Sequence, residues 1–102
     1  MLEKVKKALR QSGKAFDDEI TDLIAAAAAD LRLVGINVPK EYGSSGTTPD
    51  DPLLNRAIVL YCKANFGHFD EAGNYRQAYD YLKCSLSLYD DYQLPGGGNG
   101  NG

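Results

Sequence analysis

The sequence contains few of the residues that build metal-binding or reactive sites. Its 102 residues include two cysteines, Cys62 and Cys84, and one histidine, His68. Structural zinc sites use four cysteine or histidine ligands, so these residues do not suffice for one. His68 is expected in a loop, and nothing in the sequence orders a serine or cysteine partner beside it for nucleophilic catalysis. We therefore predict no catalytic residue, no metal site and no cofactor.

The two cysteines fall in two helices that we expect to face each other. A disulfide between Cys62 and Cys84 is therefore possible. Free thiols are favoured, because buried unpaired cysteines are common in cytosolic chains.

Long hydrophobic runs are absent as well. The longest apolar run covers residues 23–29, which is far shorter than the stretch of about 20 residues that spans a bilayer. No apolar run follows the basic residues near the N-terminus, so a signal peptide is not expected. These patterns predict a protein made in the cytoplasm, without membrane association.

Charge and length exclude further classes of protein. The net charge of −3 argues against a general nucleic-acid or membrane binder. Neither of the common glycine-rich phosphate-binding patterns is present. The length predicts one domain, residues 1–92, followed by a flexible tail, residues 93–102, that is rich in glycine and asparagine.

Apolar residues recur at helical spacing through most of the chain, which predicts an all-α fold. The expected elements are four main helices in a small bundle, joined in the middle by a long connector over residues 37–49. The four helices cover residues 2–11, 17–34, 52–66 and 75–89. Because the last two are separated by a short loop, they should be antiparallel neighbours.

Local signals mark several helix ends. Asp51 precedes a proline and should cap the third helix. Asn74, with glutamine three residues later, has the form of a capping box for the fourth helix. Asp17 is the expected cap of the second helix, and Gly35 should end it in the left-handed conformation. The acidic run of residues 17–19 is explained by capping and the helix dipole rather than by catalysis.

The fourth helix carries more apolar surface than one buried face requires. Tyr81, Leu88 and Tyr92 fall on a second strip, with Cys84 near it. This helix is either central in a small bundle, or its second face is completed by another subunit. Tyrosine is enriched at subunit contacts because it combines an apolar ring with a polar tip. We predict the same kind of contact for the connector, which contains Tyr42.

Five of the eleven basic residues lie within the first fourteen positions. They are Lys4, Lys6, Lys7, Arg10 and Lys14. The first four are expected on the outer face of the first helix, opposite Val5 and its apolar neighbours. This cluster is either a solvated helix face or a patch that faces phosphates or an acidic partner.

Three stretches resemble the small phage head–tail connector family, whose members are also described as adaptor, head-completion or DNA-packaging proteins. The resemblance is carried by residues 5–10 (VKKALR), by residues 17–27 (DDEITDLIAAA), and by residues 57–67 (AIVLYCKANFG) running on to residues 79–88 (YDYLKCSLSL). It covers most of residues 2–92 and contains no catalytic motif.

The resemblance implies a structural virion protein without enzymatic activity or cofactor. It implies a ring of about twelve copies that docks under the portal protein, contacts a tail-completion or stopper protein, and joins the DNA-filled head to the tail. The genome would pass through the ring without sequence-specific binding. The protein would be made in the bacterial host cytoplasm and reside at the head–tail interface of the virion.

Two alternatives remain open from the sequence. One is a small DNA-binding regulator that uses the basic cluster of residues 4–14. The other is a helical interaction module unrelated to virions.

Overall fold

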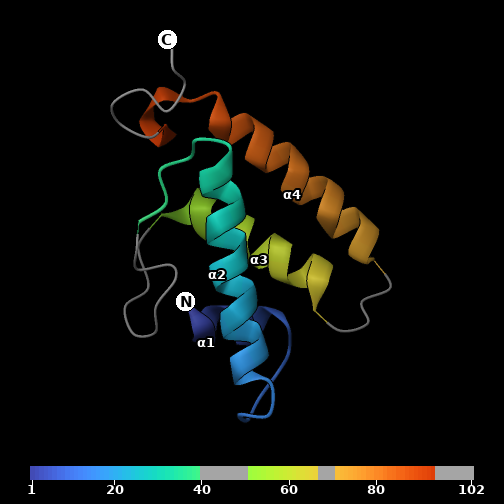
Figure 1. The fold of residues 1–102 in the computed structure, drawn as a ribbon. Helices are drawn as coiled ribbons and strands as arrows, with labels where there is room; N and C mark the ends of the chain where they lie inside the picture. Colours follow the sequence, from blue (N-terminus) through green and yellow to red (C-terminus); the bar gives the residue numbers. More distant parts are fainter. Residues whose placement is uncertain (40–50, 67–70, 94–102) are drawn as a thin grey trace.

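The computed structural model describes residues 1–39, 51–66 and 71–93, and within them the fold is all-α, as predicted (Figure 1). It contains four α-helices: α1 (Leu2–Ala8), α2 (Asp17–Leu33), α3 (Pro52–Asn65) and α4 (Ala72–Ser87). A short 3-10 helix, η2 (Asp90–Tyr92), follows α4. An isolated bridge pairs Ile36 with Gln93. Tyr42, His68 and the glycine-rich tail lie outside the described residues.

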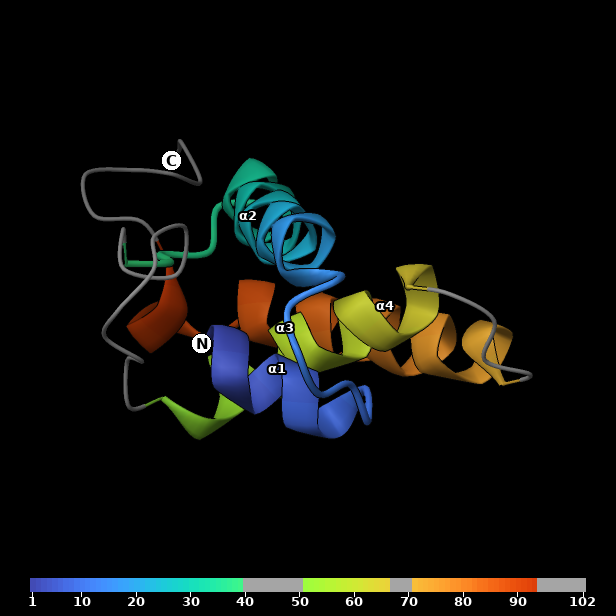
Figure 2. The ribbon, with the colours of Figure 1, turned by 90° about the horizontal axis from the view of Figure 1, so that it is seen from below.

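The helices pack around a hairpin made by α3 and α4. These two helices run in opposite directions and share the most extensive contact in the fold, which confirms the expected antiparallel pairing. Figure 2 shows α2 on one side of this pair and α1 beside α3. α1 and α2 also meet near the start of α2.

One apolar side of every helix faces a common core. The largest fully buried side chains are Val5, Leu9, Ile20, Leu31, Ile36, Ile58, Cys62 and Leu86. Burying a leucine or isoleucine of this kind stabilises the fold by about 1.5–3 kcal/mol, so these residues dominate the packing energy. The small buried residues Ala27 and Ala28 of α2 and Ala57 of α3 allow these two helices to approach closely.

Two of the predicted helix ends are confirmed. Asp51 Oδ1 accepts hydrogen bonds from the backbone N–H groups of Leu53 and Leu54, at 3.0 and 3.1 Å, and thereby caps α3. At the end of α2, Gly35 adopts a φ of 91°. The N–H of Ile36 donates to the carbonyl of Leu31 at 3.2 Å, which completes a Schellman motif.

Three other predictions about helix ends are wrong. α1 ends at Ala8 rather than at residue 11, because Arg10 turns left-handed with a φ of 60° and the Gln11 N–H bonds to the Lys6 carbonyl. α4 begins at Ala72 after an N-cap at Glu71, so Asn74 lies inside its first turn and forms no capping box. α4 also ends at Ser87, two residues before the predicted end.

The start of α2 differs from the prediction in its cap. Phe16 is the N-cap and makes no side-chain capping bond, while Asp17 is the first helical residue. The Phe16 ring packs edge-to-face on Phe66, the C-cap of α3, with ring centroids 5.5 Å apart. This pair attaches the start of α2 to the end of α3. The acidic first turn of α2 is as predicted.

Candidate interaction surfaces

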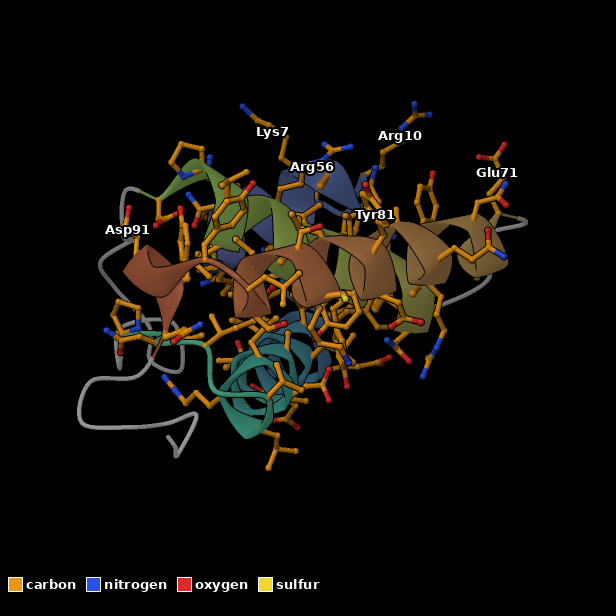
Figure 3. The ribbon with its side chains drawn as sticks, turned by 90° about the horizontal axis from the view of Figure 1, so that it is seen from above. Lys7, Arg10, Arg56, Glu71, Tyr81 and Asp91 are labelled. Atoms are coloured by element: carbon orange, nitrogen blue, oxygen red, sulfur yellow. The ribbon has the colours of Figure 1, made fainter. Side chains whose placement is uncertain are left out.

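The outer face of α4 is uncharged and exposed. Gln77, Tyr81, Cys84 and Leu88 follow one another at spacings of three and four residues, and all four are exposed. We call this row the α4 strip. Tyr81 is 78% exposed and Leu88 is 75% exposed, and Figure 3 shows Tyr81 projecting from the helix into solvent. The structure thus places both residues on the surface, where a partner can reach them.

The α4 strip is left open because the other helices cover only the opposite side of α4. Tyr79 and Leu86 are buried in the core on that side. Exposed apolar side chains that share a helix face commonly mark a contact with another protein. Whether the strip is a subunit interface stays a prediction at this point.

Tyr92, which we predicted on the same strip, occupies a different place. It lies in η2, is half-buried against the core, and its hydroxyl donates to Asp51 Oδ1 at 3.2 Å. Its carbonyl accepts from the Asn37 N–H at 2.6 Å. Burial and the Asp51 carboxylate raise the pKa of Tyr92. These bonds attach the segment after α4 to the start of α3 and to the segment after α2, so Tyr92 is already engaged within the chain.

The basic cluster is not uniform. Lys4, Lys7, Arg10 and Lys14 are exposed, but Lys6 is only 8% exposed, which contradicts the prediction that it faces outward. Lys6 Nζ forms an ion pair with Asp17 Oδ1 at 2.8 Å and donates to the carbonyl of Gly13. The turn between α1 and α2 brings these acceptors to Lys6, and they compensate for the partial loss of water around its ammonium group.

Arg56 of α3 joins the exposed lysines, which the sequence analysis missed. Lys4 and Arg56 line an open groove of about 430 Å³ between α1 and α3, together with Pro52, Asn55 and Val59. Figure 3 shows Lys7, Arg10 and Arg56 on the side of the molecule away from α2. We call Lys4, Lys7, Arg10 and Arg56 the basic face. The helical spacing of the sequence is enough to place Arg56 on the outer side of its helix. Only the packing of α1 on α3 brings it beside Lys4.

A polar cluster connects α2 to α4. Asp30 Oδ2 accepts hydrogen bonds from the Tyr79 hydroxyl and from Lys83 Nζ, the latter at 3.1 Å. Burial acts to raise the pKa of Asp30, but the bonds from Tyr79 and Lys83 outweigh it and lower the pKa below the ordinary value. Burial and the Asp30 carboxylate raise the pKa of Tyr79. The cluster borders a pocket of about 150 Å³, whose lining also includes Arg76 and Asp80.

Both cysteines are free thiols, as the sequence favoured. Cys62 is buried, and burial raises the pKa of its thiol to about 12, so it is a poor nucleophile at neutral pH. Within the described residues no three histidine, cysteine, aspartate or glutamate side chains gather into a possible metal site. None of the described helices is long and apolar enough to cross a membrane.

Comparison with known proteins decides the family. The family model for phage connector proteins matches residues 1–93. The chain belongs to the phage connector protein family. The resemblance inferred from the sequence is thereby confirmed, and it sets aside an interaction module unrelated to virions. No curated protein and no solved structure matches the chain.

Family membership gives the general role of the chain. It is a structural connector component of a phage virion, and its family is not known for an enzymatic activity. Membership also implies contact with other virion proteins such as the portal.

Proposed function

We propose that the chain assembles with copies of itself into a ring at the head–tail junction, where it joins the DNA-filled head to the tail. The ring docks under the portal and on its other side contacts a tail-completion or stopper protein. Family membership supports this role. The structural observation that carries it is the α4 strip, where Tyr81 and Leu88 are more than two thirds exposed although α4 takes part in the most extensive helix contact of the fold.

Self-assembly is the simplest way to cover this strip. A domain of this size has a modest core of its own, and leaving a tyrosine and a leucine in water forgoes the free energy that burial would give. Tyrosine is also favoured at subunit contacts. A ring of about twelve subunits would repeat the same contact around its circumference.

The charge of the chain suits a channel through which DNA moves. DNA binds tightly where lysines and arginines release its counterions, and the affinity then depends steeply on salt. The net charge of −3 disfavours such tight binding overall. We propose that the genome passes through the ring without sequence-specific contacts.

The decisive experiment measures association of the full chain in two ways. The molar mass of the free protein is measured by light scattering over a concentration range, and its attachment to portal-bearing, DNA-filled heads of the phage is measured by sedimentation. A particle of about twelve copies in either experiment supports the proposal. A chain that stays monomeric in solution and does not attach to heads overturns it.

Variants of the α4 strip show whether that surface is used. Tyr81→Ser with Leu88→Ser should reduce association while leaving the helical circular dichroism unchanged, because both side chains are exposed. Leu53→Ser, at an exposed leucine of α3 outside the strip, is the matched control and should associate as the wild type does. Equal association of all three proteins would remove the strip from the proposal.

The basic face supports a second candidate function, that of a small DNA-binding regulator. Its four exposed cations could contact phosphates. The inward position of Lys6 removes one of the cations that the sequence placed on this surface. Tight binding of duplex DNA by the isolated protein, weakening steeply as salt is raised, would favour the regulator over the ring.

A further inference from the structure

We propose that the outer face of α2 in one copy binds the basic face of the neighbouring copy, so that the subunits join head to tail through opposite charges. This inference rests on the self-assembly proposed above. It adds two further surfaces, outside the α4 strip, that meet between neighbouring copies, and it predicts that they are different surfaces rather than the same one used twice.

The outer face of α2 is acidic at its start and apolar further along. Its exposed residues are Asp18, Glu19, Asp22, Ala26, Ala29 and Leu33. Their spacing places them on the side of the helix opposite the buried residues Ile20, Ile24 and Leu31. Leu33 is 82% exposed, the highest value among the large apolar side chains of the described residues.

The charges on both faces lack ion-pair partners within the part of the chain that the structure describes. The ion pairs found there are Lys6–Asp17 and Lys83–Asp30, and neither includes a residue of the two faces. The basic face has four cations, with Glu3 as the carboxylate of α1, and the outer face of α2 begins with three carboxylates. A second copy therefore offers each face a partner of the opposite charge.

The fold prevents the two faces from meeting within one chain. α1 packs on α3 and on the start of α2, and Figure 3 shows the labelled cations projecting on the side away from α2. A contact between unlike faces on opposite sides of a subunit is heterologous. Repetition of a heterologous contact generates a closed ring or an open filament, whereas a contact between two identical faces stops at a dimer.

The shapes of the two faces are also compatible. The middle of the α2 face carries only alanine side chains, which allow close approach of another helix. The basic face contains the groove between α1 and α3, in which the half-buried Val59 supplies apolar surface between Lys4 and Arg56. A helix with small, partly apolar side chains and acidic residues at one end is a suitable occupant for such a groove.

Charge exchange between the two faces tests the contact. The first variant carries Lys7→Glu with Arg56→Glu, and the second carries Asp18→Lys with Asp22→Lys. Each alone presents like charges at every contact and should raise the apparent Kd for self-association at least about tenfold. A chain that carries all four substitutions should associate again, because its faces are once more complementary. An equimolar mixture of the two variants should associate as well.

The control variant carries Glu71→Lys with Asp91→Lys. These residues are exposed carboxylates outside both faces, and the exchange changes the net charge as much as the second variant does. It should associate nearly as the wild type does. All variants are compared with the wild type by light scattering, or by attachment to heads if only that experiment shows association, and circular dichroism checks their folding.

The outcomes separate this inference from the proposed function. If the wild type assembles and both charge variants assemble equally well, the two faces do not meet and the inference is wrong, while the ring remains. Failure of the four-substitution chain to regain association would also overturn it. Binding of duplex DNA by the wild type that the Lys7 and Arg56 substitutions abolish would assign the basic face to nucleic acid instead. A wild type that never associates overturns both proposals.

Discussion

The Tyr79 hydroxyl on α4 donates a hydrogen bond to Asp30 Oδ2 on α2, across 49 residues of sequence. Lys83 Nζ reaches the same oxygen at 3.1 Å. The Tyr79 ring is buried and packs edge-to-face on Tyr61 of α3, with centroids 5.2 Å apart. One side chain thus contacts both α2 and α3, and it links the helix that carries the α4 strip to both of them.

Removing the Tyr79 hydroxyl should destabilise the fold. Tyr79→Phe keeps the buried ring but removes a hydrogen bond to a carboxylate, and we expect a loss of about 1–2 kcal/mol in the free energy of unfolding. Urea denaturation at pH 7 measures it. Tyr81→Phe removes the same atom from an exposed tyrosine and should change stability by less than about 0.5 kcal/mol. Equal effects of the two substitutions would contradict the structural role of this bond.

The same carboxylate should make stability depend on pH. The pKa of Asp30 is lower in the folded chain than in the unfolded one, so its ionised form stabilises the fold above the unfolded pKa of about 3.9. This contribution is lost as the pH falls through the lower, folded pKa. Wild type should therefore exceed Asp30→Asn in urea midpoint at pH 7, and the two midpoints should converge in acid. A difference that stays constant down to pH 2.5 would contradict the bonded state of Asp30.

Two adjacent lysines of α1 should differ in their effect on stability. Lys6→Met retains the aliphatic chain but leaves Asp17 without its ion-pair partner, which should cost about 1–2 kcal/mol because the pair is largely shielded from water. Lys7→Met removes an exposed charge and should cost less than about 0.5 kcal/mol. Thermal unfolding of both variants at low ionic strength gives the comparison. The ranking would be refuted by a larger loss for Lys7→Met.

The two thiols should react at very different rates. Cys84 is exposed on the α4 strip, whereas Cys62 is buried and burial raises its pKa to about 12. With a chromogenic disulfide reagent at pH 7.5, one thiol per chain should react quickly, and the second only after unfolding in urea. Cys84→Ser should remove the fast phase, while Cys62→Ser retains it. Two fast thiols in the wild type would show that Cys62 is accessible.

Reactivity of Cys84 also reports on assembly. If the α4 strip is covered by another subunit or by the portal, the fast phase should slow as the protein concentration rises into the range where association occurs. The Tyr81→Ser, Leu88→Ser variant should keep its fast phase throughout. Unchanged reactivity in a fully assembled particle would place Cys84 outside the contact.

The sequence around each helix was sufficient to predict that helix without knowledge of how the helices pack. The spacing of apolar residues predicted all four, and the Asp51 cap and the Gly35 turn were confirmed because each depends on neighbours within five residues. Spacing also placed Tyr81 and Leu88 on a second strip of the last helix, but only the structure shows that this strip is exposed. The predictions failed at two ends: α1 stops at Ala8 because Arg10 turns left-handed, and the Asn74 capping pattern does not mark the start of α4.

The tertiary structure alone decided how the charges are distributed. Nothing in the sequence distinguishes the adjacent lysines Lys6 and Lys7. Only Lys6 forms an ion pair with Asp17 and donates to the carbonyl of Gly13, because the turn between α1 and α2 brings these groups to it. Asp30 and Tyr79 are bonded, and Lys4 and Arg56 share a groove, only because helices distant in sequence pack together. Periodicity gives the side of a helix on which a residue lies, because that is a property of one helix. It does not tell which other helix packs against that side. Helix packing brings together residues that are far apart in the sequence, and their spacing along the chain follows no regular period.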